Sequence, residues 1–143
     1  MILFVTHIDV RIAEDMGLPE LDAVSDCRAL GQIIDRIADK WAVMVVGHLA
    51  QGDTLRFNEL MRAIPGVSHR MLTLTLRALQ RDGIVRRTPH ATIPPRVDYA
   101  LTPLGLSLTS PLKALAGWAS ENRQAVEEAR VSFDREGSAS SAT

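Results

Sequence analysis

Cysteine, lysine and long apolar runs are all scarce in this sequence. Only one cysteine, Cys27, stands among the 143 residues, which excludes a framework of internal disulfide bonds. No apolar stretch approaches the roughly 18 residues that a membrane-spanning helix needs. The apolar start, residues 1–5, is short and has no basic region before it, so we expect no signal peptide. We therefore expect a cytoplasmic protein without membrane contact.

Motifs for catalysis or metal binding are also missing. The four histidines, His7, His48, His69 and His90, are widely separated and match no metal-ligand spacing. The sequence has neither a glycine-rich phosphate loop nor a nucleophile motif. We expect a protein that is not an enzyme and that uses no metal and no cofactor.

Positive charge is concentrated in one part of the chain. The formal net charge is −1, yet residues 56–100 hold eight arginines against three acidic residues. Arginine predominates there, since the only lysines are Lys40 and Lys113, and its planar guanidinium suits phosphates and guanine edges. A basic stripe is the footprint of nucleic-acid binding, although such a segment is more often a solvated face. Charge alone leaves both interpretations open.

Apolar residues recur with helical spacing from Leu30 to Leu49, with Trp41 as an expected core residue. Asp39 is a good N-cap for a fresh start, which predicts two helices with a corner near Ala38. Gly52 follows the last periodic residue and predicts the end of the second helix.

The central segment predicts a helix-turn-helix. Residues 57–64 can form a short helix, and Pro65-Gly66 must end it. Ser68 is an N-cap for a longer helix that Gly83 stops. Its apolar stripe consists of Leu72, Leu76 and Leu79. This order is typical of a DNA-binding helix-turn-helix, in which a four-residue turn with glycine joins a short helix to a longer one.

Two strands are expected directly after that unit. Residues 84–88 are rich in β-branched residues and arginine, and residues 97–101 alternate between apolar and polar or small side chains. Residues 89–95 must form a loop, because Pro94-Pro95 cannot donate to a sheet. Two strands joined by an extended loop after the second helix predict a β-wing.

The C-terminal part predicts a dimerisation helix. Thr102-Pro103 is a typical helix start, and Pro111 predicts a kink or a restart. The earlier elements are expected to close the core, so the apolar stripe of this helix needs a second subunit. The expected interface residues are Leu104, Leu108, Leu112, Leu115 and Trp118.

Several motifs in collinear order resemble the HxlR family of bacterial winged-helix regulators, related to the MarR group. They are Asp39-Lys40-Trp41, Arg56-Phe57-Asn58-Glu59-Leu60, Ile64-Pro65-Gly66-Val67-Ser68, Met71-Leu72-Thr73, Leu76-Arg77-Ala78-Leu79, Asp82-Gly83-Ile84-Val85, Pro94-Pro95-Arg96-Val97-Asp98-Tyr99 and Leu101-Thr102-Pro103-Leu104-Gly105. The resemblance extends from about Cys27 to Trp118. It implies a homodimer that binds double-stranded DNA, with inverted-repeat operators as the expected targets.

The predicted fold class is mainly α with a small β-wing (α+β), a winged helix-turn-helix with a C-terminal dimerisation helix. We expect an N-terminal extension of uncertain structure in residues 1–24 and the DNA-binding domain in residues 25–102. The dimerisation helix or helices should cover residues 103–133, and residues 134–143 should be disordered. The alternative is a winged-helix module for protein contacts, against which the arginine-rich face argues.

The N-terminal half of the helix after Ser68 is expected to read bases. Opposite its core stripe it carries His69, Arg70 and Thr73, which together with Ser68 can donate to base edges. Arg77 lies one turn further and is expected to contact a phosphate.

Further contacts are expected from Arg56, which precedes the short helix, and from the wing. His90 and Arg96 flank the tip of the wing. Arg86 and Arg87 point to opposite faces of their strand, so only one of them can face DNA, and we select Arg87.

Control of binding has one candidate residue. Several members of the family that this sequence resembles use a cysteine near the position of Cys27 to sense oxidants or electrophiles. Cys27 stands just before the first expected core helix. A thiol at a helix N-terminus gains reactivity, and the adjacent Arg28 could help. The alternative is a buried, inert cysteine. A small-molecule effector between the wing and the dimer helices is a further option, although no sequence feature identifies one.

Overall fold

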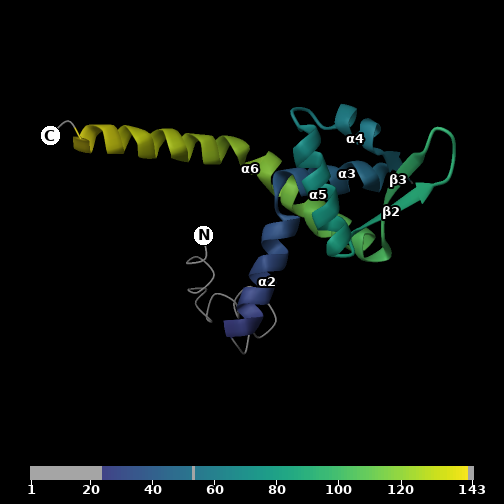
Figure 1. Cartoon of the computed structure of the whole chain (residues 1–143). Helices are drawn as coiled ribbons and strands as arrows, with labels where there is room; N and C mark the ends of the chain where they lie inside the picture. The colour runs from purple at the N-terminus through teal and green to yellow at the C-terminus, as the bar shows by residue number, and fades with distance from the viewer. Residues whose placement is uncertain (1–23, 53, 142–143) are drawn as a thin grey trace.

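The structure is a computed structural model that describes residues 24–52 and 54–141 (Figure 1). The expected N-terminal extension lies outside the described residues, apart from its last residue, Val24, where the first described helix begins. The elements in chain order are α2 (Val24–Ile37), α3 (Lys40–Gln51), β1 (Leu55–Arg56), α4 (Phe57–Ala63), α5 (His69–Arg81), β2 (Val85–His90), β3 (Arg96–Leu101) and α6 (Pro103–Ser141). Among the described helices, none is both long and apolar enough to cross a membrane.

The helices α3 and α5 begin at the predicted N-cap residues, Asp39 and Ser68. The Asp39 carboxylate accepts a hydrogen bond from the Ala42 amide at 3.3 Å, and the Ser68 hydroxyl accepts one from the Met71 amide at 3.0 Å. Each cap satisfies one of the amides that a helix leaves unpaired in its first turn. The predicted corner near Ala38 and the predicted start of the longer helix at Ser68 are both confirmed.

One apolar core lies between α3, α4, α5 and the base of the wing. The predicted stripe of α5 is confirmed, because Leu72, Leu76 and Leu79 are almost completely buried. They pack in one cluster with residues of α3 and α4, which include Val45, Val46, Leu49 and Leu60. Trp41, predicted as a core residue, is half-buried and packs against this cluster from its edge.

A three-stranded antiparallel sheet forms the wing, in the order β1-β3-β2. The predicted hairpin is confirmed, but β2 continues through Pro89 and His90, which the sequence had placed in the loop. Proline is tolerated at Pro89 because β2 is an edge strand. The strand β1 was not predicted, because its two residues, paired with Tyr99 and Asp98, are too few to show a pattern.

The helix α6 corrects three expectations. Of the two alternatives predicted at Pro111, a kink or a restart, the restart is wrong, because a single helix runs from Pro103 to Ser141. The helix also continues eight residues into the tail that was expected to be disordered. An ion pair between Arg123 and Glu127, one turn apart, supports its C-terminal half. Figure 1 shows this half projecting away from the domain.

The third correction concerns the predicted dimer stripe. Leu112 is 8% exposed and belongs to the core of its own domain, against which Leu108 also packs. The earlier elements therefore do not close the core alone. Leu104, Leu115 and Trp118 remain more than half exposed and are the part of the stripe that is free on this chain.

The start of α6 is fixed to the turn between α5 and the wing. The Thr102 hydroxyl donates to the Gly83 carbonyl, and it accepts from the Gly105 amide at 3.1 Å. Gly105 approaches the wing so closely that a Cβ atom there would lie 2.2 Å from the Ile84 carbonyl oxygen. Gly83 has a φ of +75°, which suits glycine and lets the chain turn out of α5.

Candidate DNA-binding surface

The helix α5 presents a polar face opposite its core stripe. His69, Arg70 and Arg77 are all exposed on it, as the sequence predicted. Ser68 is exposed and also caps the helix, so its hydroxyl oxygen already accepts the Met71 amide. The Thr73 hydroxyl donates to the His69 carbonyl at 2.8 Å. Its remaining capacity for DNA is therefore as an acceptor or through its methyl group.

An aromatic contact joins the two helices of the helix-turn-helix. The rings of Phe57 and His69 lie 4.7 Å apart between centroids, with 51° between their planes. This is within the range of favourable tilted aromatic pairs. It fixes the first residue of α5 against the first residue of α4. Sequence reasoning missed this contact, because two rings twelve positions apart carry no local signal.

Arg56 lies at the junction of the wing and α4. It is the last residue of β1, and its Cα is opposite Asp98 in the central strand β3. Its amide donates to the Glu59 carboxylate at 3.1 Å, which fixes the start of α4. The side chain is exposed, so the predicted phosphate contact is sterically open.

The two side chains that flank the wing tip, His90 and Arg96, share one carboxylate. His90 and Arg96 are opposite one another in the β2–β3 register. The His90 Nε2 atom lies 2.9 Å and the Arg96 Nη2 atom 3.5 Å from the Asp98 Oδ2 atom. The Asp98 side chain is only 16% exposed, so water screens these contacts less than surface pairs. The structure thus assigns Asp98, which the sequence had not singled out, as the anchor of both predicted contacts.

Arg86 and Arg87 are both exposed on the edge strand β2. They follow one another in the strand, as the predicted opposite orientation of their side chains requires. Which of them approaches DNA stays a prediction.

Cys27 lies in the first helical turn of α2, which starts at Val24, rather than before the first helix as the sequence suggested. Its side chain is outside what the structure describes, so its chemistry stays a prediction. Within the described residues, no three His, Cys, Asp or Glu side chains gather as a metal site would require.

These elements define a winged helix-turn-helix DNA-binding domain. The polar helix α5 follows a glycine turn, the supporting helix α4 precedes that turn, and the basic hairpin of β2 and β3 follows α5. Comparison with known proteins identifies its family. The family model of the HxlR-like helix-turn-helix matches residues 36–127, and the chain belongs to this family.

Individual relatives of this chain are also transcriptional regulators by name. The chain is 39% identical over 87 residues to the uncharacterized HTH-type transcriptional regulator YtfH of Escherichia coli, which covers 61% of this chain and 68% of that relative. It is 39% identical over 97 residues to the uncharacterized regulator YybR of Bacillus subtilis, or 68% of this chain and 77% of the relative. The structure of the redox regulator HypR in its reduced form matches with a TM-score of 0.64 and 37% identity, over 70% of this chain and 98% of HypR.

Family, fold and surface together make this chain a DNA-binding transcriptional regulator of the HxlR type. The alternative of a winged-helix module for protein contacts receives no support from these relatives.

Proposed function

We propose that this protein acts in the cytoplasm as a homodimer, and that it binds inverted-repeat operators through the N-terminal half of α5. The observation that carries the proposal is the exposed polar face of α5, where His69 and Arg70 follow the Ser68 cap. Free amides at a helix N-terminus also favour a nearby phosphate. The role assigned to these residues is binding, so no catalytic step is proposed.

The homodimer follows from apolar surface that one chain leaves uncovered. On α6, Leu115 and Trp118 are 54% and 59% exposed, and on α2, Ile33 and Ile34 are 57% and 48% exposed. Exposed apolar side chains of this size on two helices indicate an interaction surface. In a twofold dimer each subunit contributes the same patch.

The type of each side chain decides which part of the DNA we expect it to contact. Arg70, Thr73 and His69 read base edges, while Arg77, Arg56 and Arg87 hold phosphates. Arg96 and His90 act at the wing, where Asp98 orients them. Cys27 is the proposed sensor of oxidants, which agrees with the likeness to HypR, a protein named as a redox regulator.

Selection of binding sites from random duplex DNA, with light scattering on the purified protein, tests this proposal. We expect an enriched inverted repeat with half-sites about one helical turn, ~34 Å, apart or a multiple of that distance. We also expect a dimer at micromolar concentration. Absence of any enriched sequence would contradict DNA reading, and a monomer would contradict the paired half-sites.

A further inference from the structure

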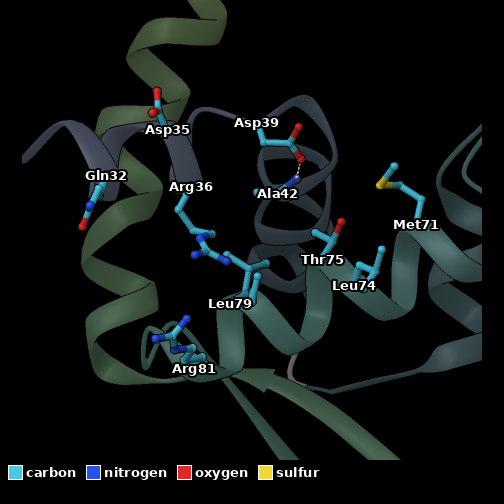
Figure 2. Close-up of a pocket in the computed structure, with 11 residues that line it drawn as sticks. Gln32, Asp35, Arg36, Asp39, Ala42, Met71, Leu74, Thr75, Leu79 and Arg81 are labelled. Atoms are coloured by element: carbon cyan, nitrogen blue, oxygen red, sulfur yellow. Dashed lines mark hydrogen bonds between the residues drawn. The ribbon is translucent and has the colours of Figure 1, made fainter. Parts of the chain in front are cut away.

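A groove of about 790 Å³ lies between α2, the start of α3 and the recognition helix α5. This volume is in the range of small-molecule sites, which is roughly 300–1,000 Å³. Figure 2 shows the residues that line the groove, with Met71, Leu74 and Thr75 on α5 and Gln32, Asp35 and Arg36 on α2.

The groove is lined by a third face of α5 that serves neither the core nor DNA. Leu72, Leu76 and Leu79 form the buried stripe, and Arg70 and Arg77 lie on the polar face. Between these two faces, Met71, Leu74 and Ala78 border the groove. Met71 is 40% and Leu74 is 51% exposed, so the helix that reads DNA keeps an apolar flank open to a ligand. Methionine adapts well to ligands of different shapes.

Charge is unevenly distributed along the groove. In Figure 2, Arg36 and Arg81 lie toward one end, while Asp35 and Asp39 lie toward the other. The Nε atom of Arg36 contacts Asp82 at 3.4 Å, which leaves its terminal nitrogens available. Arg81 forms no ion pair with any residue in the described part of the chain. Two guanidinium groups against one carboxylate make this end suited to an anion.

We propose that this groove binds a small amphipathic anion, with its apolar body against Met71 and Leu74 and its acidic group on Arg81 and Arg36. Because the groove shares α5 with the DNA-binding face, a bound ligand changes DNA affinity, and DNA changes ligand affinity by the same factor. This regulatory part rests on the proposed DNA-binding function, whereas binding of the anion itself does not.

The test uses two fluorescent probes with the same aromatic body. One is 1-anilinonaphthalene-8-sulfonate, which carries a sulfonate, and the other is the neutral N-phenyl-1-naphthylamine. We expect saturable binding of the sulfonate at one site per chain. Arg81→Ala should weaken it about tenfold, as expected for loss of a charge-assisted contact, and leave the neutral probe unchanged. Leu74→Gln and Met71→Gln, each checked for native circular dichroism, should weaken both probes. Arg123→Ala, on the projecting half of α6, is the matched control and should change neither.

Sulfonate binding that is unaffected by Arg81→Ala and Leu74→Gln would place the probe on other apolar surface and overturn the proposal. Binding that is lost as the protein dimerises would show that a second copy covers the groove, and would also overturn it. DNA affinity of the unmodified protein is measured first, by fluorescence anisotropy without probe. If DNA binds but saturating probe leaves its affinity unchanged, the regulatory part fails while the DNA-binding function stands.

Discussion

The carboxylate of Asp98 lies 2.9 Å from the His90 imidazole, across the hairpin between β2 and β3. The same oxygen also contacts Arg96 at 3.5 Å. One acidic residue in the central strand thus restrains both side chains at the wing tip, and it partly offsets the positive charge of Arg96.

Replacement of Asp98 by Asn tests this restraint. We expect tighter binding to non-operator DNA, because Arg96 is released to contact a phosphate, and the slope of log affinity against log salt should become steeper by about one unit. The measurement is a titration at several salt concentrations, with Glu127→Gln on α6 as the control. An unchanged slope would mean that Arg96 does not reach DNA when released.

In the proposed interface, Arg70 is the side chain expected to make the main base contact. Arg70→Ala should cost about 1–3 kcal/mol on the selected operator and much less on unrelated DNA, because a base contact is lost. Arg123→Ala removes the same charge far from α5 and should leave both affinities unchanged. Equal losses on operator and unrelated DNA would instead assign Arg70 to a phosphate.

The close approach of α6 to the wing predicts a pair of opposite effects on stability. Gly105→Ala places a Cβ against the Ile84 carbonyl and should lower the free energy of unfolding by about 1–3 kcal/mol or more. At Gly117 no atom lies within 4 Å of the added Cβ, so Gly117→Ala should raise it by about 0.5–1 kcal/mol. Urea unfolding of both variants measures the difference, and destabilisation of equal size by both would contradict the contact.

The cap at Ser68 supports α5, the helix proposed to read DNA. Ser68→Ala removes the acceptor for the Met71 amide and should cost about 1 kcal/mol of stability. Ser68→Asp keeps an acceptor and should retain stability, while its negative charge should weaken DNA binding. Stability and DNA affinity are therefore measured on both variants. Full stability of the alanine variant would show that the cap contributes little.

Oxidation tests the role of Cys27. Treatment with diamide should yield a disulfide between two chains, or a mixed disulfide with a small thiol, and change operator affinity. The Cys27→Ser variant should show neither effect. Non-reducing electrophoresis and a DNA-binding assay report the two outcomes. An unmodified protein that diamide leaves unchanged in both assays would remove Cys27 as a sensor.

Features set by neighbouring residues were predictable from the sequence. The caps at Asp39 and Ser68 and the turn at Gly83 depend on a few adjacent positions, and all three are confirmed. Features that depend on distant partners were not predictable. Whether Leu112 faces its own domain or a second chain depends on how α6 crosses the core, which its spacing does not encode.

The same distinction holds for the binding surface. The exposed face of α5 follows from helical periodicity, so His69, Arg70 and Arg77 could be selected before the structure. The joint contact of Asp98 with His90 and Arg96 follows from strand register, which the loop length left open. The sequence placed Pro89 and His90 in the loop, so the pairing of His90 with Arg96 at the end of the ladder was not predicted.

Because α6 is anchored at the Gly83–Ile84 turn, a small rotation there moves the far end of this helix over a large distance. Its 39 residues correspond to a length of about 58 Å, so a tilt of about 5° at the anchor moves the far end by roughly 5 Å. The anchored end of α6 lies at the junction where α5 ends and the wing begins. In the proposed homodimer, a small change in the angle at which two α6 helices cross would therefore alter the distance between the two α5 helices, and with it the operator spacing that the dimer accepts.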